Sequence, residues 1–91
     1  MDLGIKGKRA LVMGSSYGMG NGVARALAAE GVDIVLTARN QETLDAEATD
    51  MSDKFGVRVE AKACDLLKSG DLENLLDFAY EKMGGIDIQF N

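Results

Sequence analysis

The sequence has no histidine and only one cysteine, Cys64, among its 91 residues. A single cysteine cannot form an intrachain disulfide, and one cysteine without any histidine excludes a zinc site of the usual kind. Cys64 follows Ala61 and Ala63 in a strand-like run, which favours an inert buried thiol. No apolar run is long enough to span a bilayer, and none near the N-terminus resembles a secretory signal. We therefore expect a cytoplasmic protein with no membrane partner.

Positive charge is also scarce. Ten lysine and arginine residues stand against fifteen aspartate and glutamate residues, for a net charge of −5. Nucleic acids and anionic membranes require a basic surface, so we expect neither as a partner. The composition, with 46% apolar and 27% charged residues, is that of one globular domain.

Short apolar segments alternate with segments of helical periodicity along the whole chain. We expect strands at residues 9–13, 33–38, 57–63 and 86–90. We expect a first helix at about residues 18–30, a second capped by Asn40 and a third capped by Ser69. Glycines at positions 31, 56 and 84–85 are placed to end these helices. The expected core-facing residues of the helices are Met19, Val23, Ala24 and Leu27, then Leu44, Ala48 and Met51, then Leu72, Leu75, Leu76, Ala79, Tyr80 and Met83.

The order β-α-β-α-β-α-β predicts a parallel sheet, because connections that contain a helix are long enough for right-handed crossovers. The first two strands are continuously apolar, as buried central strands are. The third alternates apolar and polar residues, which is typical of a half-covered edge strand. The prediction is an incomplete, Rossmann-like, doubly wound α/β sheet with strand order 3-2-1-4, formed by residues 1–91 as one domain.

The first strand is followed by the glycine-rich loop Gly14-Ser15-Ser16-Tyr17-Gly18-Met19-Gly20. Gly14 allows a tight exit from the strand, Gly18 allows close approach of a pyrophosphate, and Gly20 allows the helix to pack closely on the sheet. Free N–H groups at the helix start would hold phosphates, with hydroxyl donors added by Ser15 and Ser16. Glycines also occur in plain tight turns, so it is the position between a buried strand and a helix that favours phosphate binding.

The spacing G-x-x-x-G-x-G resembles that of the short-chain dehydrogenase/reductase family, which carries T-G-x-x-x-G-x-G at this place. The resemblance extends from Lys8 to Asn91, and Met13 stands where the family has threonine. Loss of that hydroxyl is expected to weaken the ordering of the loop more than phosphate binding. The resemblance implies an oxidoreductase that transfers hydride between a nicotinamide cofactor and an alcohol or carbonyl substrate.

The second strand ends in Leu36-Thr37-Ala38-Arg39-Asn40 and lacks the acidic residue that binds the adenosine ribose in NAD-dependent Rossmann proteins. Arg39 would instead pair with the 2′-phosphate of NADP, and the resemblance implies that Ser16 also faces this phosphate. We therefore expect NADP(H) as the cofactor, with NAD(H) as the weaker candidate. Two features argue the other way: Tyr17 stands where many NADP-preferring members carry a basic residue, and Arg39 could simply be a solvated loop arginine.

Two further positions resemble cofactor-contacting positions of the family. Asp65-Leu66 matches an acidic-aliphatic pair that contacts adenine, although Asp65 could equally cap the turn after the third strand. Asn91 matches the first residue of the family's N-N-A-G motif. We include all three residues in the expected cofactor site.

The catalytic tyrosine–lysine pair of the family is not found in this sequence. The family's lysine follows its tyrosine by four residues, whereas Asn21 follows Tyr17 and Gly84 follows Tyr80 at that spacing. We therefore expect no catalytic residue here, and a small-molecule substrate only in the intact protein. Two hypotheses remain: the N-terminal, truncated half of an oxidoreductase, or a standalone or engineered half-domain that self-associates through its unpaired fourth strand as a homo-oligomer.

Overall fold

The computed structural model describes residues 4–91, so residues 1–3 of the expected domain lie outside the described residues. Four strands alternate with three helices. The strands are β1 (Arg9–Met13), β2 (Asp33–Thr37), β3 (Val59–Ala61) and β4 (Ile88–Phe90), and the helices are α1 (Gly18–Ala29), α2 (Gln41–Phe55) and α3 (Asp71–Met83). Every strand pair is parallel and the order is β3-β2-β1-β4, which confirms the predicted fold class.

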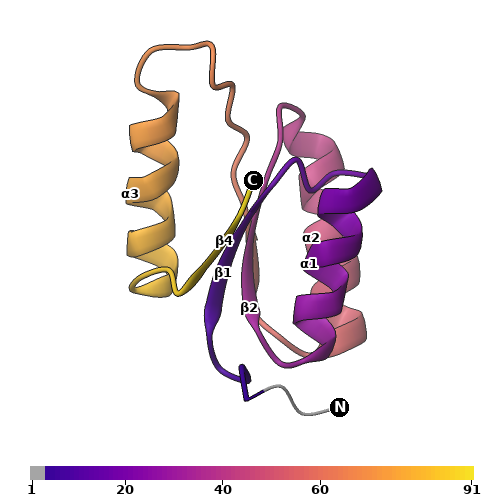
Figure 1. The fold of residues 1–91 in the computed structure, drawn as a ribbon. Helices are drawn as coiled ribbons and strands as arrows, with labels where there is room; N and C mark the ends of the chain where they lie inside the picture. Colours follow the sequence, from indigo (N-terminus) through magenta and orange to yellow (C-terminus); the bar gives the residue numbers. More distant parts are fainter. Residues whose placement is uncertain (1–3) are drawn as a thin grey trace.

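The sheet separates two helical layers, with α1 and α2 on one face and α3 on the other (Figure 1). Successive residues of a strand face opposite sides of a sheet. In β1, Val12 therefore packs in the core under α1 and α2, while its neighbour Leu11 packs in the core under α3. Ile34 and Val35 of β2 divide in the same way. The two central strands are thus buried on both faces, as their continuous apolar runs predict.

The ends of the helices follow local sequence signals with one exception. The Asn40 side chain accepts a hydrogen bond from the Thr43 N–H at 2.9 Å, and Gly56 and Gly84 end their helices in the left-handed conformation. These three predictions are confirmed. The predicted cap at Ser69 is wrong, because the chain enters α3 through Gly70 with φ of 84° and no side chain caps the helix.

Three strands are shorter than predicted. Strand β3 spans three residues instead of seven, although the Lys62 and Cys64 N–H groups still donate to carbonyl oxygens of the chain at β2. On its outer edge, the Gln41 side chain accepts from the Ala63 N–H at 2.7 Å and donates to the Ala61 carbonyl at 3.2 Å. A side chain of α2 therefore takes the place of a further strand. Strands β2 and β4 begin or end one or two residues inside the predicted ranges, 33–38 and 86–90.

The predicted helix faces are correct for α2 and partly wrong for α1 and α3. Helix α2 buries Leu44, Ala48 and Met51 as predicted. Helix α1 buries the small residues Gly20, Ala24 and Ala28, while Met19 is exposed. Helix α3 buries Leu75 and Ala79 and leaves Leu72, Leu76 and Tyr80 exposed. Periodicity identifies an apolar stripe, but the neighbouring layer decides which part of a wide stripe is covered.

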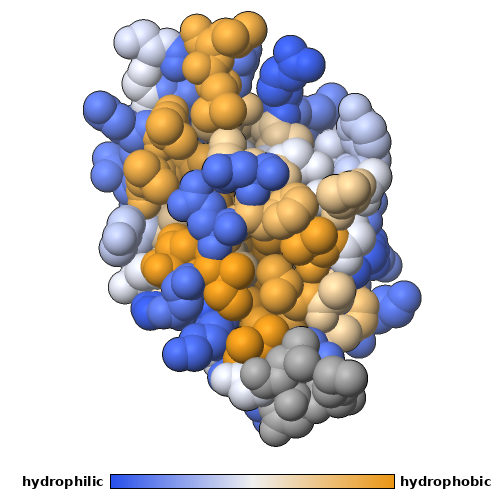
Figure 2. Space-filling view, viewed as in Figure 1, coloured by the Kyte–Doolittle hydropathy of each residue, from blue (hydrophilic) through white to orange (hydrophobic). Residues whose placement is uncertain are grey.

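Apolar atoms gather on the face of the molecule that carries β4 (Figure 2). Among residues 4–91, β4 pairs with one strand, β1, and its other edge is unpaired. Beside it, Leu76 and Tyr80 of α3 line a shallow hollow with Ile86 and Ile88. Within residues 4–91, no helix has both the length and the apolar character needed to cross a membrane.

An ion pair joins the two ends of the chain where β1 meets β4. Arg9 Nε lies 3.0 Å from Asp87 Oδ2, a second guanidinium nitrogen lies 3.2 Å from Oδ1, and the Arg9 backbone N–H also donates to Oδ2 at 2.9 Å. The side-chain and backbone hydrogen bonds from Arg9 lower the pKa of Asp87 below its ordinary value of 3.8. The charged form of Asp87 therefore stabilises the folded state more than the protonated form does.

We expect Asp87→Asn to lower the urea concentration at which half of the protein is unfolded at pH 7. In acid, the substitution should have little effect. A carboxyl group whose pKa is depressed by folding stabilises the protein above its unfolded pKa, and this contribution is lost as pH falls through the folded pKa. The difference in midpoint between the wild type and Asp87→Asn should therefore shrink below about pH 4. Urea titrations from pH 7 downward measure it, and a difference that stays constant with pH would contradict the assignment.

Candidate functional site

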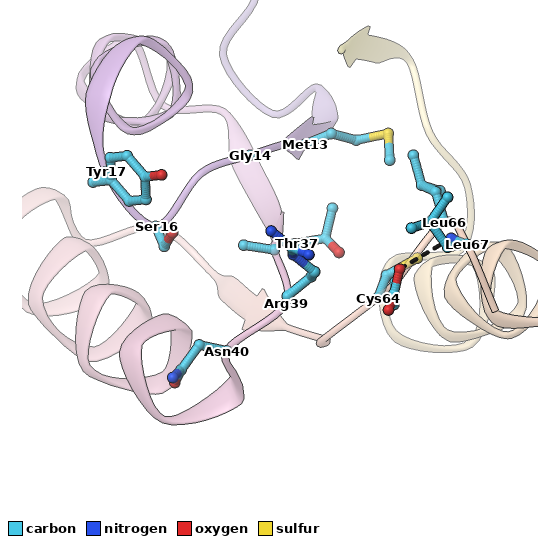
Figure 3. Close-up of a pocket in the computed structure, with 12 residues that line it drawn as sticks. Met13, Gly14, Ser16, Tyr17, Thr37, Arg39, Asn40, Cys64, Leu66 and Leu67 are labelled. Carbon is cyan, nitrogen blue, oxygen red and sulfur yellow. Dashed lines mark hydrogen bonds between the residues drawn. The ribbon is translucent and has the colours of Figure 1, made fainter.

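A pocket of about 620 Å³ opens where β1, β2 and β3 end (Figure 3). The carboxyl ends of parallel strands share one edge of the sheet, and ligands of open α/β sheets bind outside that edge. The pocket is lined by residues from the three strand ends and the segments that follow them: Met13, Gly14, Ser16, Tyr17, Thr37, Ala38, Arg39, Asn40, Cys64, Asp65, Leu66 and Leu67.

The N-terminus of α1 has the free donors that an anion requires. Its N-cap residue, Tyr17, is extended, and no side chain of residues 4–91 caps the first turn. The helix dipole adds partial positive charge to these N–H groups. Gly14 and Gly18 have φ of 65° and 67°, and a β-carbon at either position would meet nothing within 4 Å. The loop is therefore bare on its outer side, where a phosphate group fits against backbone N–H groups.

Gly20 is the point at which α1 touches the end of β1. A β-carbon at this position would lie 2.3 Å from the Gly14 carbonyl oxygen and 2.9 Å from that of Met13. Both neighbours are backbone atoms that cannot rotate away. The close packing expected of this glycine is therefore present, and only glycine fits.

The Ser15 hydroxyl is not a free donor to a ligand, which corrects the prediction for this side chain. Ser15 is fully buried, donates to the Val12 carbonyl at 2.9 Å and accepts from the Thr37 N–H at 3.0 Å. Its backbone N–H also donates to the Thr37 carbonyl at 3.1 Å. Ser15 thus ties the loop to the ends of β1 and β2, beside the position where Met13 replaces the family threonine. Ser16, in contrast, lines the pocket.

Arg39 follows the end of β2 and shares the pocket with Ser16 and Tyr17. Its guanidinium group makes no hydrogen bond or ion pair with any other of residues 4–91, so its charge is available to a ligand. The next residue, Asn40, caps α2 and fixes the path of the chain at this point. Tyr17 is 82% exposed and its side chain is not a carboxylate that would repel a phosphate.

Asp65 caps the turn that leads from β3 towards α3. Its Oδ1 accepts from the Leu67 N–H at 3.0 Å, and its own N–H donates to Asp71 Oδ2 at 3.0 Å. Asp65 thus caps the turn after the third strand, as the sequence also allowed. Leu66 beside it lies exposed at the rim of the pocket. Cys64 is buried as predicted, and burial together with Asp71 and Asp65 raises the pKa of its thiol.

The pocket contains some but not all of the predicted site residues. Gly14, Ser16, Tyr17, Arg39, Asp65 and Leu66 line it, whereas Ser15, Gly18, Met19, Gly20 and Asn91 do not. Asn91 follows β4 and accepts a hydrogen bond from the Gln89 side chain. Six lining residues were not predicted as site residues: Met13, Thr37, Ala38, Asn40, Cys64 and Leu67. All but Leu67 lie within three residues of a strand end, which is the signal that could have identified them.

Thr37 differs from the other lining residues because its side chain is a buried hydroxyl without a partner among residues 4–91. It is 1% exposed, and its hydroxyl has no hydrogen-bond partner among residues 4–91. A buried hydroxyl without a partner is rare in folded proteins. Thr37 therefore adds a polar group to the floor of the pocket between the ends of β1 and β3.

A family model for short chain dehydrogenases matches residues 8–91. The chain belongs to this family. Among curated relatives, it is 31% identical over its full length to 3-oxoacyl-[acyl-carrier-protein] reductase of Aquifex aeolicus, of which it covers 37%. It is 35% identical over 96% of its length to D-beta-hydroxybutyrate dehydrogenase of Cupriavidus necator, of which it covers 33%. The chain therefore spans about a third of the length of these family members.

Solved structures of the family agree closely with this fold. L-sorbose reductase from Gluconobacter frateurii, in complex with NADPH and L-sorbose, superposes with a TM-score of 0.93 and 39% identity, covering 98% of this chain and 34% of that one. An alcohol dehydrogenase from Thermococcus sibiricus, in complex with 5-hydroxy-NADP, has a TM-score of 0.87 and 32% identity over 90% of this chain and 35% of that one. The likeness confirms the Rossmann-like fold of this chain.

We expect Gly20→Ala to destabilise the fold, because its new methyl group overlaps backbone of β1 and the loop. The cost is about 1–3 kcal/mol or more of the free energy of unfolding. Gly22→Ala is the matched control, since nothing lies within 4 Å of a β-carbon there and alanine favours a helix over glycine by about 0.5–1 kcal/mol. Urea unfolding measures both, and equal effects of the two changes would refute the close contact.

Proposed function

We propose that this chain is the NADP(H)-binding part of a short-chain dehydrogenase that reduces carbonyls or oxidises alcohols in the cytoplasm. The observation that carries the proposal is that Arg39 and Tyr17, the N-cap residue of α1, line one pocket. Among residues 4–91, no side chain caps this helix start and none pairs with the Arg39 guanidinium. Both favour anions, and NADP(H) carries a pyrophosphate and a 2′-phosphate. When bound, the cofactor supplies or accepts the hydride.

The pyrophosphate is proposed to lie over the glycine-rich loop. Gly14 and Gly18 leave the outer side of the loop free of side-chain atoms, and Ser16 adds a hydroxyl at the pocket wall. Ser15 contributes through the backbone that it fixes. Gly20 contributes by holding the helix start at the sheet edge. Met19 and Tyr17 belong to the same turn and present backbone N–H groups.

The 2′-phosphate is proposed to pair with Arg39. A charge-assisted hydrogen bond is worth about 1.5–3 kcal/mol, which corresponds to roughly ten- to a hundredfold in affinity. No carboxylate ends β2, whereas a carboxylate there would repel this phosphate. The NADPH and 5-hydroxy-NADP bound in two structural relatives support the same cofactor here.

The adenine is proposed to lie against Leu66, with the second oxygen of Asp65 near its exocyclic amine and Asn91 bordering the site. Leu66 is exposed at the pocket rim, as a residue that covers a ring must be. Substrate binding and proton transfer belong to the intact protein, because neither Tyr17 nor Tyr80 has a lysine four residues later. The part played by this chain is to bind and orient the cofactor.

We expect Arg39→Asp to weaken NADPH binding about ten- to a hundredfold and to change NADH binding little. Arg58→Asp is the matched control, because Arg58 has the same charge but lies at the opposite end of the sheet, before β3. Isothermal titration calorimetry of the three proteins with each nucleotide measures the effect. Equal losses for NADPH and NADH would show that Arg39 does not contact the 2′-phosphate.

A second candidate function is self-association of this half-domain without catalysis. It is favoured by the unpaired edge of β4 within residues 4–91 and by the exposed apolar residues Leu76 and Tyr80 in the hollow beside it. Unpaired strand edges and contiguous apolar surface are sites of protein association. A second copy would cover the same surface on both partners.

If the chain self-associates in this way, Leu76→Glu should shift it towards monomer. Met19→Glu is the control, because Met19 is also exposed but lies on α1, across the sheet. Sedimentation velocity over a hundredfold range of concentration measures the mass. A wild-type monomer throughout, or an equal shift by both variants, would contradict association through α3 and β4.

A further inference from the structure

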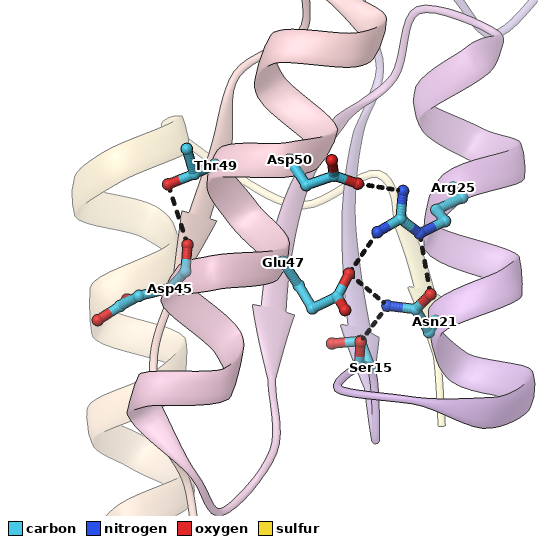
Figure 4. Close-up of polar contacts among 7 residues, drawn as sticks. All are labelled: Ser15, Asn21, Arg25, Asp45, Glu47, Thr49 and Asp50. Atoms are coloured by element: carbon cyan, nitrogen blue, oxygen red, sulfur yellow. Dashed lines mark hydrogen bonds and ion pairs between the residues drawn. The ribbon is translucent and has the colours of Figure 1, made fainter.

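A polar network joins the glycine-rich loop to α1 and α2 (Figure 4). Asn21, in the first turn of α1, donates from Nδ2 to the Ser15 carbonyl oxygen at 3.0 Å and to Glu47 Oε2 at 3.2 Å. Its Oδ1 accepts from Arg25 Nε at 2.9 Å. Arg25 also pairs with Glu47, and its remaining nitrogen lies 2.7 Å from Asp50 Oδ2. The Asn21 amide is therefore held at both ends by charged side chains.

The bond from Asn21 to Ser15 determines the direction of a backbone donor. In a trans peptide, the C=O and the N–H point to opposite sides, and the described chain contains no cis peptide. Asn21 draws the Ser15 carbonyl inward, towards α1 and α2. The N–H of the same peptide, which belongs to Ser16, is therefore directed away from the helices. It makes no hydrogen bond with any other of residues 4–91, and Ser16 lines the pocket.

We propose that Asn21 is a positioning residue that holds the Ser15–Ser16 peptide so that the Ser16 N–H is presented to a phosphate oxygen. The inference rests on the proposed function, because it takes the dinucleotide as the source of that phosphate. Glu47 and Arg25 hold Asn21 in the required orientation. Without this bond the peptide is free to turn, and its carbonyl oxygen would then face the anion.

The same network fixes α2 against α1. Glu47 and Asp50 lie on α2, and their partners Asn21 and Arg25 lie on α1. Helix α2 begins directly after Asn40, and Arg39 precedes that cap. The network therefore also fixes the spacing between the glycine-rich loop and Arg39, the two segments assigned to the two phosphate groups.

Two substitutions test the proposal. Asn21→Ala removes the donor to Ser15, and Asn21→Asp replaces it with an oxygen while keeping an acceptor for Arg25. Neither weakens the helix, because alanine has the higher helix propensity and an acidic residue is favourable in the first turn. A role confined to helix stability therefore predicts no loss of affinity. We expect both variants to bind NADPH about tenfold more weakly than the wild type, the effect of one lost hydrogen bond.

Thr49→Ala is the control. Thr49 donates to the Asp45 carbonyl on α2, so the change removes a side-chain hydrogen bond of this helix without touching the network. It should bind NADPH like the wild type. Calorimetric titration measures all four proteins, and wild-type affinity in both Asn21 variants would overturn the proposal.

The backbone orientation is tested separately from cofactor binding. In ¹⁵N–¹H spectra without nucleotide, the Ser16 amide resonance should move in Asn21→Ala and remain in place in Thr49→Ala. An unchanged Ser16 amide in Asn21→Ala would overturn the proposal whatever the affinities. If the wild type bound no NADPH, the proposed function would fail, and the Ser16 amide would still decide whether Asn21 sets the loop.

Discussion

The backbone contact at Gly20 is the constraint on which the rest of the site depends. There the first turn of α1 lies so close to the backbone of Met13 and Gly14 that no β-carbon fits. The contact brings the uncapped N-terminus of α1 to the carboxyl edge of the sheet and not to its side. The partial positive charge of the helix is consequently delivered to the place where three strands end and the pocket begins.

Some polar side chains at this edge form hydrogen bonds with backbone groups, and others form none with the described residues. Ser15 joins the loop to β1 and β2, Asn40 starts α2, and Gln41 completes the outer edge of β3. Their hydrogen bonds are satisfied within the fold. Arg39 has no such partner among the described residues, so its charge remains for a ligand. This division separates the residues that build the site from those proposed to recognise the cofactor.

The features that sequence analysis predicted correctly depend on local chemistry. The apolar runs of β1 and β2, the cap at Asn40 and the glycine after α2 each follow from a few adjacent residues. The errors concern contacts between distant segments. Nothing near Met19 or Tyr80 indicates which part of their apolar stripes a neighbouring layer will cover, and both side chains are exposed.

The site was also predicted correctly where adjacent residues determine it, and wrongly where contacts between distant segments do. The loop and Arg39 were found because each directly follows a predicted strand, and Asp65-Leu66 was found through the family resemblance. The Ser15 hydroxyl was misassigned because its partner, Thr37, lies 22 residues away in the sequence. The network of Asn21, Arg25 and Glu47 was missed because its members lie on two helices whose relative rotation is a property of the packed fold.

The most direct test of the central claim is an NADPH titration of the ¹⁵N-labelled chain, followed amide by amide. If the carboxyl edge of the sheet binds the dinucleotide, the largest shifts will occur at Ser16, Gly18, Arg39 and Leu66. Amides at the opposite edge, such as those of Gly31, Gly56 and Gly84, will stay in place. Shifts confined to that opposite edge, or no shifts at millimolar NADPH, would contradict the account.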